Sequence, residues 1–224
     1  MGAIYTELTE LLITPPGNLA FHIILAFAVA GALQAAFSLW RDSEFPQGRR
    51  MVFGLALILV GRLALFLMAG LGSQGLVNEH QLLPIIDRAV TAWGLILIIW
   101  LWAFPEPQRS ADAATTLLIL LNLTGLALSL VWWQDNQADT YFNQTWLDAG
   151  WEIFSLAILG LGWLVLLLRR PNGYGFGLTM LLFATLGHAL HLALPAADSD
   201  FPGLVRLAQL ASYPWLLALP QRFR

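Results

Sequence analysis

The stretch "MVFGLALILVGRLALFLMAGL", residues 51–71, decides the fold because it surrounds one arginine with apolar and small residues. An α-helix rises 1.5 Å per residue, so this run is about 31 Å long and matches the hydrocarbon thickness of a bilayer. Its single charged residue, Arg62, lies near the centre of the run. We therefore predict a membrane-spanning helix with a buried guanidinium group at mid-depth.

The composition of the whole chain supports this prediction. Of its 224 residues, 58% are hydrophobic and 11% are charged, about half the charged share of a soluble domain. Apolar runs of spanning length predict seven transmembrane helices, at 19–40, 51–71, 83–104, 114–133, 147–168, 174–195 and 203–220. The connections are short, so we predict one all-α integral membrane protein, a seven-helix bundle over 19–221. Residues 1–18 precede it as an extracytoplasmic segment, and 222–224 begin a cytoplasmic tail.

The arginines predict how the bundle is oriented. Loops on one side of the membrane carry Arg41, Arg49, Arg50, Arg109, Arg169, Arg170, Arg222 and Arg224. The loops on the opposite side carry acidic residues instead, namely Glu7, Glu10, Glu79, Asp135, Asp139, Asp198 and Asp200. Because cytoplasmic loops are enriched in basic residues, the amino terminus is predicted outside and the carboxyl terminus in the cytoplasm. The expected location is the plasma (inner) membrane, as a multi-pass protein.

Ionisable groups within the predicted spans mark the candidate site, because such groups are costly in lipid and usually functional or paired. Most fall in the outer half of the bundle, which suggests an outward-open polar pocket. The predicted ligand-binding residues are Arg62, Asp87, Arg88, Glu152, His188, His191, Arg206 and Tyr213. For Arg62, an ion pair with Glu152 and a direct contact with an acidic ligand group both remain open. Scattered ion pairs between helices are the alternative to a shared pocket.

The last predicted span carries the candidate coupling element. Arg206, Gln209 and Tyr213 are spaced i, i+3 and i+7, which places them along one helix face. Pro214 follows and is expected to kink the helix, since proline lacks a backbone N–H. Gln209 and Pro214 are therefore predicted to couple a bound ligand to the cytoplasmic end.

Several chemistries are excluded or disfavoured by residue type. The chain has no lysine, which excludes a retinal Schiff base, and no cysteine, which excludes thiolate sites. It has no recognisable catalytic motif, no phosphate-binding loop and no nucleic-acid surface, so we expect neither an enzyme nor a nucleic-acid-binding protein. No cofactor is predicted; a metal or haem at His188 and His191 is the minority interpretation.

The seven closely spaced helices, the outside amino terminus and the exit segment "RLAQLASYPWLLALPQRFR" resemble the seven-transmembrane amino-terminal sensor region of bacterial multidomain signalling proteins, notably sensor histidine kinases. The resemblance implies a sensory module that binds a small or amphiphilic ligand and signals through helix seven. It also implies a cytoplasmic signalling domain as partner, in the same native chain or another, and a homodimer is compatible with it. A membrane enzyme or redox subunit, and a structural subunit of a membrane complex, are the alternatives.

Overall fold

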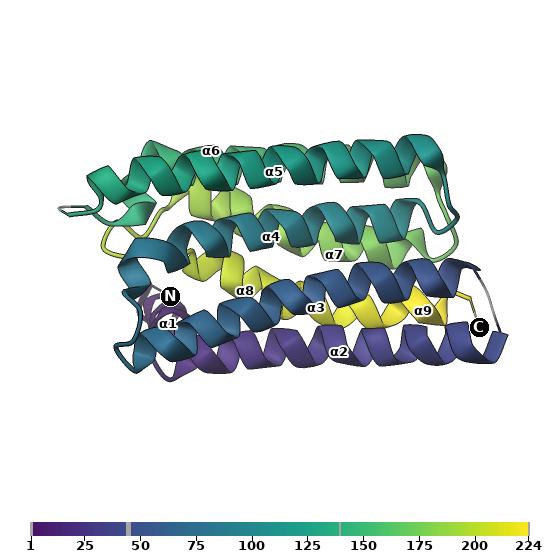
Figure 1. The fold of residues 1–224 in the computed structure, drawn as a ribbon, viewed down its shortest axis with the longest axis horizontal. Coiled ribbons are helices and arrows are strands. Elements are labelled where there is room, and N and C mark those ends of the chain that lie inside the picture. The colour runs from purple at the N-terminus through teal and green to yellow at the C-terminus, as the bar shows by residue number, and fades with distance from the viewer. Residues whose placement is uncertain (1, 44–45, 139, 224) are drawn as a thin grey trace.

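A computed structural model describes residues 2–43, 46–138 and 140–223, and within these ranges the chain is helical and contains no strand. In order, the elements are α1 (Gly2–Ile13), α2 (Gly17–Ser43), α3 (Pro46–Ser73), α4 (Glu79–Ala103), α5 (Arg109–Asn136), η1 (Phe142–Gln144), α6 (Trp146–Arg169), α7 (Tyr174–Ala193), α8 (Gly203–Ser212), η2 (Tyr213–Leu217) and α9 (Ala218–Gln221). The long helices run side by side along one axis (Figure 1). The prediction of an all-α bundle is confirmed.

Six helices, α2 to α7, are long and apolar enough to cross a membrane. They correspond to the first six predicted spans. The seventh predicted span, 203–220, is divided among α8, η2 and α9, which together run along the bundle beside α2 and α3 (Figure 1). The change to a 3₁₀ helix begins at Tyr213, and Pro214 lies in its first turn. Proline removes one backbone donor and crowds the preceding turn, so it interrupts an α-helix there.

Helix α4 lies at the centre of the bundle and packs against α3, α5, α6 and α7. In its most apolar window 72% of the residues are buried, compared with 17% in α5. Large apolar side chains such as Phe27, Phe53 and Leu168 instead face outward and are exposed. An apolar exterior around a buried core is the arrangement expected for helices that contact lipid.

Arginines tie the helix ends together at one end of the bundle. Arg222 donates to the carbonyl oxygens of Leu101 and Trp102 at 2.8 and 3.0 Å, which satisfies acceptors at the end of α4. Burial lowers the pKa of Arg222 to about 10, so the group stays charged at neutral pH. Arg50 bonds Asp112 at 2.5 Å and stacks 3.8 Å from the Trp100 ring.

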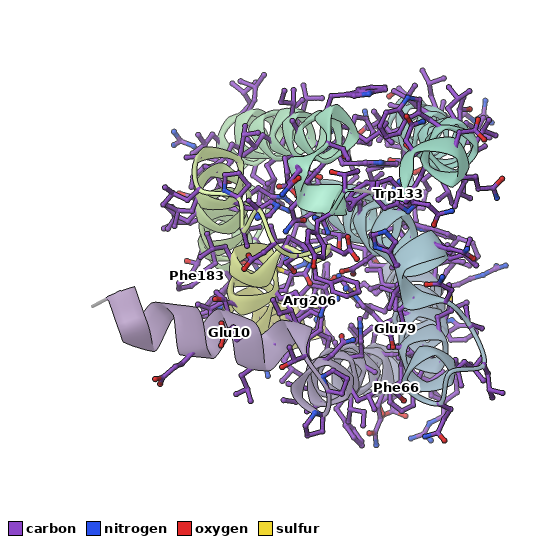
Figure 2. All side chains as sticks on the ribbon, turned by 90° about the vertical axis from the view of Figure 1, so that its left-hand side faces the viewer. Glu10, Phe66, Glu79, Trp133, Phe183 and Arg206 are labelled. Atoms are coloured by element: carbon purple, nitrogen blue, oxygen red, sulfur yellow. The ribbon has the colours of Figure 1, made fainter. Side chains whose placement is uncertain are left out.

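Short helix α1 lies across the opposite end of the bundle, beside α8 and α2 (Figure 2). Here the start of α4 meets the α5–α6 and α7–α8 connections. His80 approaches Asp200 at 2.6 Å, and the other carboxylate oxygen of Asp200 accepts from the Phe142 backbone N–H at 2.8 Å. Trp133 also donates to the His80 carbonyl at 2.8 Å. These contacts fix the loops that surround the candidate site.

The close approach of α7 and α8 depends on Gly187. A Cβ atom added there would lie 2.4 Å from Ala208 Cβ and 3.2 Å from the Leu204 carbonyl oxygen. We expect Gly187→Ala to lower the free energy of unfolding by about 1–3 kcal/mol, as overpacking does. The matched control is Gly160→Ala in α6, where an added Cβ meets no atom within 4 Å. Unfolding by denaturing detergent checks the pair, and an equal effect of both substitutions would contradict this account of the α7–α8 contact.

Candidate functional site

Six charged side chains are buried in the half of the bundle that lies near α1. They are Arg62, Arg88, Arg206, Asp87, Asp148 and Glu152, and none is more than 3% exposed. Three guanidinium groups and three carboxylates balance one another when the buried histidines are neutral. Isolated charges are very unfavourable in a low-dielectric interior, so this balance is a condition for the fold.

The first group of contacts joins α4, α6 and α7. Arg88 donates to Asp148 Oδ1 from Nε at 2.8 Å and from Nη2 at 2.5 Å, and its Nε lies 3.6 Å from Glu152 Oε1. His188 Nδ1 lies 2.5 Å from Glu152 Oε2, and His191 Nε2 lies 3.1 Å from Asp148 Oδ2. We call these five residues the carboxylate–histidine cluster. The sequence spacing indicates that Asp148 and Glu152 share one helix face and that His188 and His191 share another. The structure brings these two faces into contact.

The local sequence explains why α6 presents its two carboxylates to α7. The side chain of Thr145 accepts from the Asp148 backbone N–H at 3.2 Å and begins the helix there. Asp148 and Glu152 are four residues apart and therefore share one face, as His188 and His191 do at a spacing of three. Because α6 and α7 face each other, Asp148 lies opposite His191 and Glu152 lies opposite His188.

A second group of contacts surrounds Arg206 on α8. Its Nη1 donates to the Leu12 carbonyl at 2.7 Å and to Asn18 Oδ1 at 2.8 Å, and its Nη2 donates to Asp87 Oδ2 at 3.0 Å. The guanidinium also lies 4.4 Å from the centre of the Phe201 ring. One side chain on α8 therefore connects α1, α2 and α4.

Arg62 on α3 bonds the same helical segment further along. Its Nε donates to the Tyr213 hydroxyl at 3.1 Å, its Nη2 bonds the same oxygen, and its Nη1 donates to Gln209 Oε1 at 3.4 Å. Gln209 in turn donates to Thr91 Oγ1 at 3.0 Å. The suggested ion pair with Glu152 is wrong, because Arg88 and His188 occupy that carboxylate and no carboxylate of the described residues lies within 4.0 Å of Arg62. Its three bonds go to neutral groups of the seventh segment.

Two hollows adjoin these contacts. An outer pocket of about 560 Å³ lies between α1 and the α7–α8 connection, with Glu10, His191, Asp198 and Leu204 among its lining residues. An inner cavity of about 10 Å³ is lined by His188, Thr91, Gln209 and Tyr213, among others. The inner cavity is about the size that holds one water molecule, whereas the outer pocket can hold a small ligand.

The predicted ligand-binding residues therefore have three different places in the structure. His191 lines the outer pocket, whereas His188 and Tyr213 line the inner cavity. The remaining predicted residues are bonded to other buried groups and do not line the outer pocket: Arg62, Asp87, Arg88, Glu152 and Arg206. The outer pocket presents two acidic residues, Glu10 and Asp198, and no arginine. Neither Arg62 nor Arg206 lines this pocket, so neither is placed to bind an acidic group of a ligand there.

Two asparagines are part of the site although the sequence gives no sign of it. Asn143 accepts from Arg88 Nη2 at 2.6 Å and donates to the carbonyls of Ala196 and Phe201 at 3.1 and 3.0 Å. Asn18 accepts from Arg206. Asn143 lies in a connection and Asn18 near a helix start, so neither belongs to a periodic polar stripe that would have indicated burial.

Among the described residues, one group of side chains has the geometry to hold a metal ion. Asp148, Glu152 and His191 each offer a ligand atom, and these atoms lie within 4.8 Å of one another. All three side chains are buried. Carboxylate and imidazole donors together suit divalent ions such as Zn²⁺ or Mn²⁺.

No family model, curated protein or solved structure matches this chain.

The Arg206–Asp87 pair should dominate stability at this end. We expect Arg206→Met to lower the free energy of unfolding by about 3–5 kcal/mol, because it leaves the buried Asp87 carboxylate without its partner. The double variant Arg206→Met, Asp87→Leu should be more stable than Arg206→Met alone.

The control for this pair is Arg41, which pairs with Asp42 where their side chains are 68% and 65% exposed. Its replacement by alanine should change the free energy of unfolding by less than about 0.5 kcal/mol. Detergent unfolding followed by circular dichroism gives all three values. A double variant less stable than the single one would refute the role of the unpaired charge.

Proposed function

We propose that this protein is a membrane sensory module that binds a small ligand in the outer pocket and transmits a shift through its seventh segment. The observation that carries the proposal is the position of α8. Leu204, at its start, lines the outer pocket. The same segment carries Arg206 and Gln209, and it changes to a 3₁₀ helix at Tyr213.

The contacts support a mechanical connection between the pocket and the far end. A ligand between α1 and the α7–α8 connection would press on two elements that Arg206 joins, since it bonds the Leu12 carbonyl of α1. Movement of α8 would then act on Tyr213 and Gln209, which Arg62 holds at the junction with η2. A 3₁₀ turn in mid-membrane is a place where a helix can change its packing at low cost.

A ligand signals only if it binds one arrangement better than another. The two arrangements in this proposal differ in the seventh segment, where Ser212 to Ala218 join α8 to α9 through η2. Gln209 and Pro214 have the coupling role that their positions in the sequence suggest. Output would pass to a cytoplasmic signalling domain, in the same native chain or a separate one, and a homodimer is compatible with this.

The proposal includes seven membrane crossings, with the α1 end outside and the end at Arg222 in the cytoplasm of a bacterial cell. It is supported by the arginines at the helix ends beside the α2–α3, α4–α5 and α6–α7 connections. These connections lie at the end opposite α1 (Figure 1).

Topology is readily tested because the chain has no native cysteine. Asp198 and Glu106 are exposed at opposite ends of the bundle. In intact cells we expect a membrane-impermeant maleimide to label Asp198→Cys, and to label Glu106→Cys only after the membrane is opened. The reverse pattern would overturn the orientation, and labelling of both from outside would overturn the three crossings between them, α5 to α7.

The coupling itself can be tested without knowing the ligand. Cysteines at Glu10 and Asp198, which both line the outer pocket, can be joined by a short bismaleimide as the probe. We expect this link to shift the ¹⁹F resonance of 5-fluorotryptophan at Trp215, which lies in η2. Tyr213→Phe removes the hydroxyl that Arg62 binds and should abolish the shift.

The control for the coupling test is the same double-cysteine protein treated with N-ethylmaleimide, which modifies both sites without joining them. Trp40, at the end of α2 away from the pocket, serves as the internal reference. An unchanged Trp215 resonance in the linked protein would contradict transmission through the seventh segment.

A further inference from the structure

We propose that Asp148, Glu152 and His191 form a binding site for one divalent transition-metal ion that enters from the outer pocket. The inference deepens the proposed function and rests on it in one respect, because it names the class of ligand that the module detects.

The distances within the group fit one shared ion. Asp148 Oδ2 and His191 Nε2 are 3.1 Å apart. Two donor atoms at that separation, each bound at about 2.0–2.2 Å, subtend roughly 90–100° at the ion, which lies between the octahedral and the tetrahedral angle. The Glu152 ligand atom lies within 4.8 Å of both, so a small movement of its side chain brings it to coordination distance.

An unused acceptor points independently to a bound cation. Glu152 Oε1 is buried and accepts no hydrogen bond, although Arg88 Nε lies 3.6 Å away. A buried carboxylate oxygen without a hydrogen bond is costly and needs an explanation. The other oxygen of this carboxylate bonds His188 Nδ1 at 2.5 Å, so Oε1 is the one left for a metal.

The surrounding contacts are those that orient metal ligands in proteins. His188 fixes Glu152, and Arg88 fixes Asp148 through Oδ1 while leaving Oδ2 toward His191. Asn143 in turn fixes Arg88 at 2.6 Å. Such partners set the direction of each ligand and typically change metal affinity 10–100-fold.

The charge of the cluster also favours a cation. With neutral histidines, two carboxylates and one guanidinium leave a single negative excess on the α6–α7 side, and Arg62, which would balance it, bonds neutral groups elsewhere. Three protein ligands leave a fourth position on the ion for water or an anion. His191 lines the outer pocket, so the ion has an entry path from outside.

The donor set selects the class of metal. Two carboxylates and one imidazole suit Zn²⁺, Mn²⁺ or Fe²⁺, whereas Ca²⁺ takes six to eight oxygen ligands and Cu(I) prefers sulfur. We therefore use Zn²⁺ as the titrant and Co²⁺ as its spectroscopic substitute.

The experiment is calorimetric titration of Zn²⁺ into chelator-treated protein in lipid nanodiscs, with the Co²⁺ visible spectrum as a second readout. We expect one ion per chain and a tetrahedral Co²⁺ spectrum. His191→Ala and Glu152→Gln should each weaken Zn²⁺ binding by about 100-fold, in line with the loss of a ligand. Glu152→Gln keeps the shape of the side chain, and circular dichroism verifies that each variant is folded.

The matched control is His80→Ala. His80 also pairs with a carboxylate, Asp200, at 2.6 Å, but belongs to no group of three ligands in the described part of the chain. It should leave Zn²⁺ binding unchanged.

Three results would overturn the metal site: no saturable binding, an equal loss in His80→Ala and His191→Ala, or folded Glu152→Gln protein that binds Zn²⁺ as the natural sequence does. The failure of the site is distinguishable from failure of the sensory proposal. The linked pocket and the Trp215 resonance report coupling with chelator present, so they succeed or fail without any metal.

Discussion

The need to give three buried arginines polar partners inside an apolar bundle governs this structure. Arg62, Arg88 and Arg206 are almost completely buried, at a depth where an unpaired charge is very costly. Each is placed against partners from other helices, and these partners determine how the helices are rotated and how close they lie. The packing of α4, α6, α7 and α8 is therefore a consequence of charge placement as much as of apolar contact.

The seventh segment shows this dependence most clearly. Its α-helical part bears Arg206 and Gln209, and the change to 3₁₀ geometry comes at Tyr213, the residue that Arg62 holds. Pro214 explains why the α-helix is interrupted, and the Arg62 contacts explain why the interruption stays packed inside the bundle. A weakened helix held by a strong polar contact is a suitable element for transmitting a shift, which is why we place coupling there.

The two hollows divide the polar residues by accessibility. The outer pocket reaches the carboxylate–histidine cluster through His191, and the inner cavity reaches it through His188. The cluster thus lies between a pocket that can admit a ligand and a cavity bounded by Gln209 and Tyr213. In the proposed mechanism, this order from pocket to cluster to seventh segment would connect ligand binding at one end with the helix junction at Tyr213.

The sequence by itself determined the all-α membrane fold, six apolar spans and the arginine-rich end, because run length and loop charge are local properties. It also placed Asp148 with Glu152 and His188 with His191, since helical spacing alone puts them on common faces. Only the tertiary structure decided the partners. The sequence indicates how deep a residue lies in the bundle but not the direction in which its helix is rotated, and successive residues on a helix point about 100° apart. Depth alone therefore made Glu152 the expected partner of Arg62. In the structure the rotation of α6 directs Glu152 toward Arg88 and His188. Asn143 joined the site through loop packing, for which a sequence has no periodic signal, because its contacts come from segments more than 50 residues away.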